Sequence, residues 1–463
     1  MSRPRVVIVG GGFGGLATAR GLSDFDAEIV LVDRANHHLF QPLLYQVAMA
    51  GLSPADIAVP IRRVLRDQPN VRVLLAEVQD LDLDARSLSL DDGSRLHFDT
   101  LVLAVGAKTN FFGKDSTFGR YALGLKTVDE ALEIRRRVLC AFEAAEREPD
   151  EVTRRRLLCF VIIGGGATGV ELAGALSDLS RTVLADDFRA IDPKEARVVL
   201  VERAERLLPG AFGEKLQERA KAQLEELGVE VLLKRSVTDI SARGVRMGEN
   251  GEERLESATV IWTAGVRGVE LAACAGVELD ASDRILVEPD CSLRGYPEVF
   301  AIGDVVRFVP EGERDPLPGL APVAAQQGRH VAECILRRAR GKPTTPFVYV
   351  DKGIMATIGR SRAVAQTWGG RLRLTGFLAW LAWLFVHIWF LIDFRNRVSV
   401  LLNWFWSYIS YRRGARLITG QRPWELAERL AAPLPPSGEG TGPEADATPG
   451  RAADGVAGQP RVG

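Results

Sequence analysis

Cysteine and histidine are scarce in this 463-residue sequence, which has five of each. The cysteines are scattered, without a Cys-x-x-Cys pair or a metal-ligand spacing, at Cys140, Cys159, Cys274, Cys291 and Cys334. This distribution excludes a disulfide framework and a zinc site, and it favours buried, inert thiols. We therefore predict neither a bound metal nor a redox-active cysteine pair.

A strong charge of either sign is also absent. The formal net charge is −1, so the composition gives no indication of nucleic-acid binding, and the length allows two or three domains. The chain opens with Met-Ser-Arg-Pro-Arg and enters an apolar strand that is too short for the core of a secretory signal. We expect the protein in the cytosol or on the cytosolic face of a membrane.

What the sequence does contain is the same nucleotide-binding motif twice. Each copy is a short apolar strand, at 6–9 and 160–163, followed by Gly-x-Gly-x-x-Gly and a helix-compatible segment. The glycines allow a tight turn and let the backbone approach a pyrophosphate, which the N–H groups of the helix N-terminus then bind. The predicted phosphate-binding residues are Gly10, Gly12, Phe13, Gly14 and Gly15 in the first motif and Gly164, Gly166 and Gly169 in the second.

A carboxylate ends the second strand of each unit. Asp33 lies 23 positions after Gly10, close to the usual spacing of about 20, and can accept both ribose hydroxyls of an adenosine. Glu202 lies 38 positions after Gly164, which predicts a helical insertion over residues 177–195. Because a carboxylate repels a 2′-phosphate, the second unit is expected to bind NADH in preference to NADPH.

Three further strands lead into glycine turns, at 101–106, 260–265 and 299–304. We assign Gly106 and Gly265 to cofactor binding. Asp304 either directs its carboxylate at a ribityl-pyrophosphate or only caps a helix. Since the chain returns to its first unit at Asp304, the sequence predicts an α/β fold of two Rossmann-like dinucleotide-binding domains, the second inserted into the first.

Two dinucleotide sites without a cysteine pair fit hydride transfer from nicotinamide to flavin. The flavin is assigned to the first unit, residues 1–120 and 271–370, and the nicotinamide nucleotide to residues 121–270. Glu171 follows the second glycine motif. It either borders the nicotinamide or is only a carboxylate that stabilises the helix dipole.

The C-terminal quarter is apolar and rich in tryptophan. Residues 377–393 carry only two ionisable side chains, and five of the eight tryptophans lie between 380 and 406. The next helix has a polar stripe at Ser399, Asn403, Ser407 and Ser410. This pattern favours amphipathic helices over residues 371–420 that lie in a membrane interface, with arginines of the segment 371–416 reaching lipid phosphates. A spanning hairpin and dimer packing are the alternatives.

Two other segments have simpler interpretations. The arginine triplets 135–137 and 154–156 are expected on solvated helix surfaces, with phosphate or lipid contact as the alternative. The tail over 433–463 is rich in proline and glycine, lacks aromatic residues, and is predicted to be disordered.

Together these segments resemble the type II, non-proton-pumping NADH:quinone oxidoreductases. The generic part of the resemblance is the pair of glycine motifs. Further matching blocks are Asn36–Ala48, Thr109–Gly113, Ala301–Asp304, Ala324–Gly328 and Lys352–Gly359. The more specific part is formed by Phe40–Ala48, by Gln326-Gln327-Gly328 and by the tryptophan-rich helices.

The resemblance implies a peripheral enzyme on the cytoplasmic face of the cell membrane. FAD would be held non-covalently, with Ala325 among its contacts, and reduced by NADH before passing two electrons to a quinone. Gln326 and Gln327 would flank the flavin and the quinone head. Lys352 would lie near the flavin pyrimidine edge, or it is an ordinary solvated lysine. A homodimer is compatible with the helices.

One residue departs from the family pattern. Pro322 stands where a glutamine is often found, and proline offers neither an amide side chain nor a backbone donor. The type of quinone is therefore left open.

Rival functions make different demands on the sequence. A disulfide reductase or a sulfide:quinone oxidoreductase requires redox cysteines near the flavin, and residues 36–50 contain none. A soluble reductase with a protein acceptor leaves the tryptophan-rich helices without a role. A non-catalytic NADH sensor would keep the fold without turnover.

Overall fold

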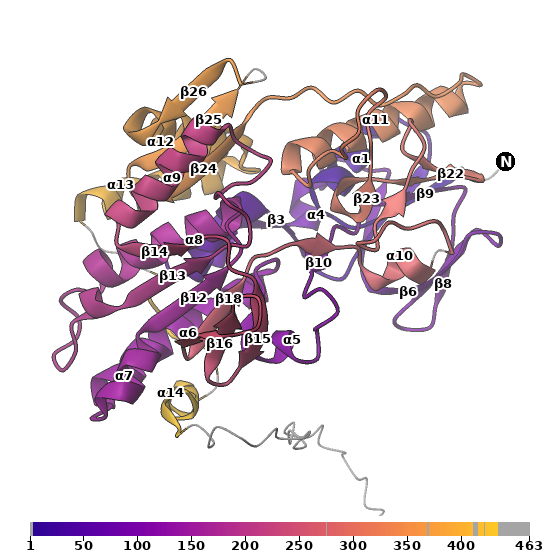
Figure 1. The fold of residues 1–463 in the computed structure, drawn as a ribbon. Helices are drawn as coiled ribbons and strands as arrows, with labels where there is room; N and C mark the ends of the chain where they lie inside the picture. Colours follow the sequence, from indigo (N-terminus) through magenta and orange to yellow (C-terminus); the bar gives the residue numbers. More distant parts are fainter. Residues whose placement is uncertain (1–2, 275, 368–369, 411–414, 421, 434–463) are drawn as a thin grey trace, which may run out of the picture.

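A computed structural model describes residues 3–433 except 275, 368–369, 411–414 and 421 (Figure 1). The predicted disordered tail therefore lies, beyond Pro433, outside the described residues.

The first of two large sheets has the strand order β21-β22-β9-β1-β2-β5. All neighbours are parallel except β21 and β22. Its central strands are almost entirely buried, as expected for apolar runs covered on both faces. Helix α1 (Phe13–Gly21) packs closely against α11 (Ala321–Ala339). The strands are β1 (Arg5–Val9), β2 (Glu28–Asp33), β5 (Val71–Leu75), β9 (Thr100–Leu103), β21 (Ser292–Leu293) and β22 (Tyr296–Ala301).

The second large sheet is wholly parallel, in the order β11-β18-β12-β13-β14. Its strands come from the chain between β9 and β22, so the second unit is inserted into the first, and the predicted fold class is confirmed. A short antiparallel pair, β10 (Lys108–Thr109) and β19 (Val266–Arg267), forms where the chain enters and leaves the insertion. The strands are β11 (Ala122–Leu123), β12 (Cys159–Ile163), β13 (Arg197–Val201), β14 (Val229–Leu232) and β18 (Thr259–Trp262).

A third layer follows the second sheet. Strands β24 (Ile354–Gly359), β25 (Arg362–Thr367) and β26 (Leu372–Thr375) form an antiparallel sheet beside helix α8 (Ala167–Asp178). Helices α12 (Gly376–Phe390) and α13 (Phe394–Ser410) continue from it, and α12 packs on β25 (Figure 1). Within the described ranges, no helix has both the length and the apolar character that crossing a bilayer requires.

One helix near the end of the chain was not anticipated from the sequence. Helix α14 (Pro423–Ala431) buries Leu426, Ala427 and Leu430 against α6 (Val128–Arg147). A short apolar stripe at i, i+1 and i+4 was the available signal, but nine residues between polar segments gave little periodicity to detect.

The prediction that both arginine triplets lie on solvated helix surfaces is wrong for Arg135 and Arg156. Arg135 is buried in α6 and donates from Nε to the carbonyl of Val47 at 2.7 Å and from Nη2 to that of Leu52 at 2.8 Å. Arg156 is buried at the end of α7 (Glu151–Leu157) and donates to the Leu430 carbonyl of α14 at 2.7 Å. These guanidinium groups satisfy backbone carbonyls between segments, a role that a one-dimensional pattern cannot indicate.

The long spacing before Glu202 has a partly helical cause. Helix α8 continues into a π-helical turn at Leu179–Val183, and a 3₁₀ turn follows at Pro193–Glu195. The insertion is therefore an extension of α8 plus a loop. The four cysteines whose side chains are described, Cys140, Cys159, Cys291 and Cys334, are buried and unpaired, as predicted.

Smaller elements complete the two units. The strands are β3 (His37–Leu39), β4 (Ala58–Pro60), β6 (Val78–Asp82), β7 (Ser87–Leu90), β8 (Arg95–His97), β15 (Val237–Ser241), β16 (Gly244–Met247), β17 (Glu253–Glu256), β20 (Ile285–Leu286) and β23 (Val306–Arg307). The helices are α2 (Leu44–Ala48), α3 (Pro54–Ile57), α4 (Ile61–Val64), α5 (Phe118–Tyr121), α9 (Glu214–Glu226) and α10 (Glu270–Cys274), with 3₁₀ turns at Gln41–Leu43 and Gly303–Val305.

Candidate functional site: two dinucleotide cradles

The first glycine motif forms an open turn between β1 and α1. Gly10 has φ +105°, and a Cβ at this position would lie 2.3 Å from the Ala104 carbonyl oxygen, so only glycine fits. Gly12 is the N-cap of α1 without a side-chain cap, and a Cβ added there would meet no protein atom within 4 Å. The uncapped N–H groups therefore face open space that a pyrophosphate can occupy.

Asp33 lies at the end of β2, directly beside this turn. Its carboxylate accepts from Gly11 N–H at 2.5 Å and from Ala35 N–H at 2.7 Å. The carboxylate is thus held at the edge of the cradle, where a ribose of a bound dinucleotide would lie.

The late segment of the chain packs against the first cradle. Gln327 is fully buried on α11, and its Oε1 accepts from Gly303 N–H at 2.8 Å. Its Nε2 is buried without a partner among the described residues, so a donor is available to a ligand. A Cβ added at Gly14 would lie 3.3 Å from the carbonyl oxygen of Ala324, which brings the Ala324–Gly328 block against the first motif.

The second cradle repeats the first. Gly164 has φ +110°, and Gly166 caps α8 with open space at its Cβ position. Glu202 accepts from Gly165 N–H at 2.5 Å and from Ala204 N–H at 2.7 Å. Gly169 packs against the start of the turn, since a Cβ there would lie 1.9 Å from the Gly164 carbonyl oxygen.

Glu171 does not act as a helix-dipole carboxylate. Helix α8 begins at Ala167, so Glu171 lies beyond the first turn, and it is buried. Burial raises its pKa to about 8, although a hydrogen bond from Thr357 N–H at 3.3 Å opposes this shift. At neutral pH the side chain is therefore mainly a neutral carboxylic acid that can donate a proton.

Gln326 and Lys352, both predicted to lie near the flavin, make the following contacts. Gln326 Nε2 donates to the Val350 carbonyl at 3.0 Å, and Val350 N–H donates to Gln326 Oε1 at 3.0 Å. Lys352 is exposed, and its Nζ lies 6.0 Å from the centre of the Phe390 ring at the end of α12.

Gly106 and Gly265 form turns with φ of +72° and +84° after β9 and β18.

Two residues of the first cradle had no role assigned from the sequence. His38 donates from Nδ1 to the Gly11 carbonyl at 3.1 Å, and burial lowers its pKa to about 4, so the ring is neutral. Its Nε2 is buried without a partner among the described residues and can accept from a ligand hydroxyl. Lys126 places Nζ 3.8 Å from Asp304 Oδ2. His38 belongs to the matching stretch Asn36–Ala48, whereas Lys126 had no signal in the sequence.

Comparison with known proteins agrees with this geometry. The pyridine nucleotide-disulphide oxidoreductase family matches residues 4–328. The chain is 43% identical over 433 residues to a type II NADH:quinone oxidoreductase, NdhA, of Mycobacterium tuberculosis, covering 90% of both chains. It is 32% identical over 376 residues to a type II NADH:quinone oxidoreductase of Staphylococcus aureus, covering 79% of this chain and 90% of that protein.

Among solved structures, NDH2 from Plasmodium falciparum in complex with NADH superposes with a TM-score of 0.81 at 20% identity. The match covers 90% of this chain and 100% of that one, and it shows a shared fold. Since the sequence relatives are similar over nearly their whole length, the chain belongs to the type II NADH:quinone oxidoreductase family.

Proposed function

We propose that this protein oxidises NADH and reduces a quinone without pumping protons, with FAD in the first cradle and NADH in the second. When bound, the flavin accepts the hydride of NADH and passes two electrons on to the quinone. The observation that carries the proposal is the pair of open, glycine-cornered turns, each with its own carboxylate, in a chain that is 43% identical to a type II NADH:quinone oxidoreductase.

The residues of the first cradle fit FAD. The open N-terminus of α1 accommodates the pyrophosphate, and Asp33 is held where it can accept ribose hydroxyls. His38 and Gln327 offer an acceptor and a donor that are buried and have no other partner among the described residues. We assign residues 1–120 and 271–370 to this domain.

Residues 121–270 form the proposed NADH domain. Glu202 accepts ribose hydroxyls and repels the 2′-phosphate of NADPH. Glu171 would border the nicotinamide and hold a proton close to the reacting rings, since it is a buried residue of the phosphate-binding helix α8. Lys352 would favour the negative charge of the reduced flavin.

We further propose that α12 and α13 bind the cytoplasmic face of the cell membrane. The polar side of α13 faces the protein, because Ser399 Oγ and Asn403 Nδ2 donate to Asp56 at 2.7 and 3.3 Å. The side chains of Ser407 and Ser410, predicted to share this stripe, lie outside what the structure describes. The apolar sides are left exposed, as Phe385 at 67% and Phe405 at 64% illustrate.

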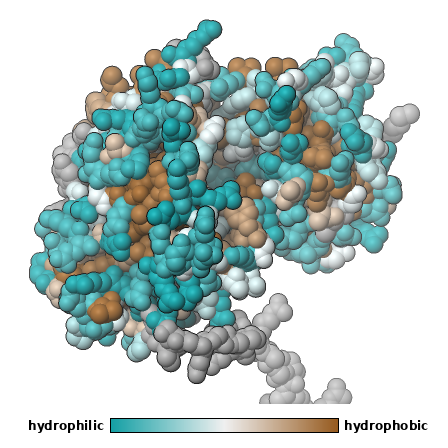
Figure 2. Space-filling view, in the orientation of Figure 1, coloured by the Kyte–Doolittle hydropathy of each residue, from teal (hydrophilic) through white to brown (hydrophobic). Residues whose placement is uncertain are grey.

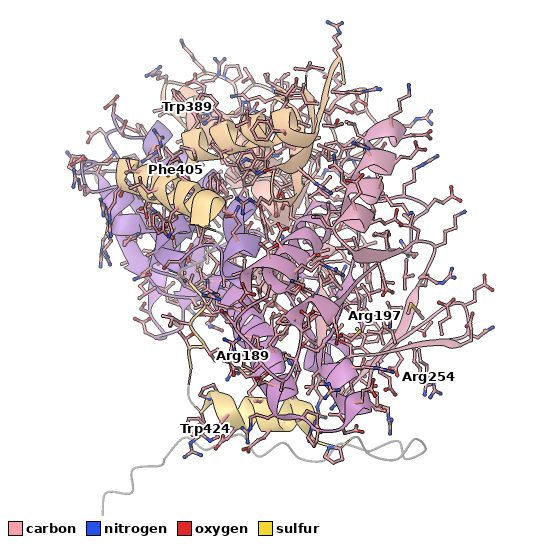
Figure 3. All side chains as sticks on the ribbon, turned by 90° about the vertical axis from the view of Figure 1, so that its left-hand side faces the viewer. Arg189, Arg197, Arg254, Trp389, Phe405 and Trp424 are labelled. Carbon is pink, nitrogen blue, oxygen red and sulfur yellow. The ribbon has the colours of Figure 1, made fainter. Side chains whose placement is uncertain are left out.

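The position of these side chains suits an interface. Trp389 on α12 and Phe405 on α13 lie at the same end of the molecule, far from Trp424 on α14 (Figure 3). The face seen in Figure 2 is instead covered mainly by hydrophilic residues with smaller apolar areas between them. Exposed apolar side chains on both α12 and α13 suit a lipid surface, from which a lipid-soluble acceptor would reach the protein. The same surface is compatible with a homodimer.

The reaction is tested by anaerobic titration of the purified flavoprotein with NADH, followed by addition of a short-chain quinone in detergent. The flavin absorbance should bleach with one equivalent of NADH and return on quinone addition. Protein that lacks flavin, or flavin that NADH does not bleach, would contradict the proposal.

Membrane binding is tested with Phe385→Gln and Phe405→Gln. Each change removes roughly 1.5–3 kcal/mol of apolar burial in lipid, so partitioning onto vesicles with anionic phospholipid should fall about 10-fold or more. Trp424→Gln is the matched control, since Trp424 is 56% exposed but lies on α14. Equal partitioning of all three variants and the unmodified protein would remove the membrane assignment.

A further inference from the structure

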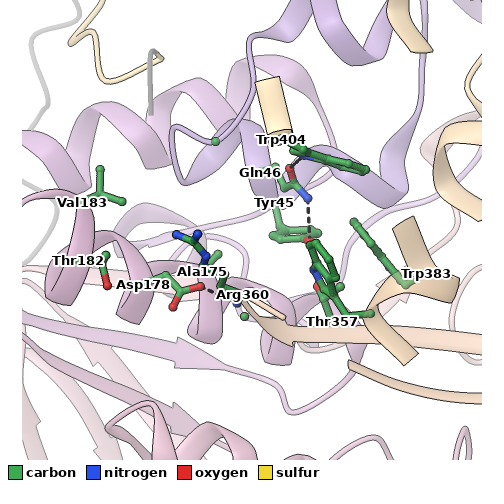
Figure 4. A pocket seen from close by; sticks show the side chains of 13 residues that line it. Tyr45, Gln46, Ala175, Asp178, Thr182, Val183, Thr357, Arg360, Trp383 and Trp404 are labelled. Carbon is green, nitrogen blue, oxygen red and sulfur yellow. Dashed lines mark hydrogen bonds between the residues drawn. The ribbon is translucent and has the colours of Figure 1, made fainter. Parts of the chain in front are cut away.

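A cavity separates the proposed membrane helices from the nucleotide-binding units (Figure 4). Its walls come from α2, α8, β24, α12 and α13, so residues far apart in the sequence meet in it. One end is aromatic, with Trp383 and Trp404, and the other holds Asp178, Thr182 and Arg360 (Figure 4). The cavity therefore has an uncharged end that adjoins the exposed apolar helices.

A chain of hydrogen bonds crosses the uncharged end. Trp404 Nε1 donates to Gln46 Oε1 at 2.7 Å, and Gln46 Nε2 donates to the Tyr45 hydroxyl at 3.0 Å. The Tyr45 hydroxyl lies 2.8 Å from Thr357 Oγ1, and Thr357 N–H donates to Glu171. The aromatic end of the cavity is thus only a few contacts from the acid on the phosphate-binding helix α8.

Two side chains at this end, Gln46 and Trp383, each have an N–H group that a ligand could accept. The Gln46 amide has a second N–H beyond the one given to Tyr45. Trp383 is 2% exposed, and its Nε1 has no hydrogen-bond partner among the described residues. A buried donor without an acceptor costs about 1–3 kcal/mol, which a ligand carbonyl would offset.

The surrounding rings favour a flat, neutral ligand. His387 stacks on Trp383 with ring centres 4.2 Å apart, and burial lowers its pKa to about 4, so it is uncharged at neutral pH. Its Nδ1–H donates to the Trp383 carbonyl at 2.7 Å, which fixes the ring. Uncharged aromatic walls with a few donors match a planar dicarbonyl ring and disfavour an ion.

Helix α11 supplies no amide at position 322, because Pro322 has none. Gln326 bonds to the backbone of Val350 through both Nε2 and Oε1. Gln327 Oε1 accepts from the Gly303 turn, and its Nε2 remains available to a ligand of the first cradle. None of these three residues of α11 lines the cavity.

We propose that Gln46 and Trp383 recognise a carbonyl oxygen of the quinone headgroup. This inference rests on the proposed quinone reduction and adds the residues that select the acceptor. Gln46 donates its second amide N–H and Trp383 its indole N–H, while Tyr45 and Trp404 hold the Gln46 side chain in place.

The test compares Gln46→Leu and Trp383→Phe with the unmodified protein, using a short-chain quinone in detergent so that membrane binding does not contribute. Each change removes one hydrogen bond to a neutral acceptor, so the quinone KM should rise about 3–10-fold. The rate of flavin reduction by NADH, and turnover with ferricyanide, which needs no carbonyl recognition, should stay within about 2-fold. Trp424→Phe is the matched tryptophan control and should leave the quinone KM unchanged.

The quinone KM values of the two variants support or overturn the inference. A raised quinone KM in both variants, with normal flavin content and normal flavin reduction, supports the inference. An unchanged quinone KM in Trp383→Phe overturns the role of its indole, and an unchanged value in both variants overturns the site. If Gln46→Leu loses its flavin through misfolding, Trp383→Phe alone decides. Failure of the unmodified protein to reduce quinone would instead refute the proposed function.

Discussion

The two nucleotide cradles share almost the same local geometry and differ in what closes them. In each, a carboxylate accepts at 2.5 Å from the N–H of the residue after the first glycine of the motif, Gly11 or Gly165, and at 2.7 Å from the N–H two positions after itself. The first is closed by Gly303, Asp304 and Gln327 from the late part of the chain. On helix α8 of the second, Thr357 N–H donates to the buried Glu171. The local geometry of the motif is thus repeated, whereas the segments that pack beside it differ between the two units.

The largest effect should come from closing either turn with a methyl group. Gly15→Ala would place a Cβ 1.8 Å from the Gly10 carbonyl oxygen, and Gly169→Ala would place one 1.9 Å from that of Gly164. We expect Gly15→Ala to lose flavin more than 100-fold, seen as colourless protein. Gly169→Ala should stay yellow but lose its reduction by NADH. If both variants lose the same cofactor, the assignment of one dinucleotide to each cradle is wrong.

The next effect distinguishes the two carboxylates. Glu202→Ala should raise the NADH KM about 10–100-fold and erode the preference over NADPH, because charged hydrogen bonds to ribose are lost and the repulsion of a 2′-phosphate is removed. Steady-state kinetics with both nucleotides measures this. Asp33→Asn, the counterpart in the first cradle, should weaken flavin binding and leave nucleotide preference intact. Unchanged discrimination in Glu202→Ala would contradict the NADH assignment.

A smaller effect, on the stability of the protein, should depend on pH through the ionisation of Glu171 beside the second cradle. The folded pKa of Glu171, about 8, lies above its usual value of 4.5. The unfolded chain therefore ionises first, and stability falls as pH rises from about 4.5 to about 8. Glu171→Gln should recover on the order of 1–2 kcal/mol of the free energy of unfolding that the unmodified protein loses over this pH range. The melting temperature of the variant should therefore exceed that of the unmodified protein at pH 8 and match it near pH 5. An equal difference at both pH values would refute the ionisation.

The smallest effect concerns Lys126, which has no counterpart assigned in the second cradle. Its Nζ lies 3.8 Å from Asp304, and both side chains are partly exposed. Lys126→Met should weaken flavin binding only about 2–5-fold, since partly exposed ion pairs are worth 1 kcal/mol or less. Flavin release during dilution measures this. A loss as large as that of Gly15→Ala would mean that Lys126 binds the flavin directly.

Local patterns predicted the cradles well because each is built from neighbouring residues. The turns at Gly10 and Gly164 require positive φ, and the carboxylates at Asp33 and Glu202 follow from strand length and direction. The arginines of α6 and α7 show the opposite case. Arg135 and Arg136 are adjacent in the sequence, yet Arg135 is buried on carbonyls of residues 47 and 52, and Arg136 pairs with Glu133 on the helix surface.

By itself the sequence determined the two dinucleotide-binding units, the insertion of one into the other, and the existence of apolar helices after the last sheet, since these depend on short-range spacing and hydrophobic periodicity. Only the tertiary structure decided that the polar side of α13 binds Asp56, so that its apolar side is exposed. Only the tertiary structure placed Gln46 beside Trp383 and Trp404 and buried Glu171 behind Thr357. Burial and long-range hydrogen bonds depend on which segments meet, and that is a property of the packed chain.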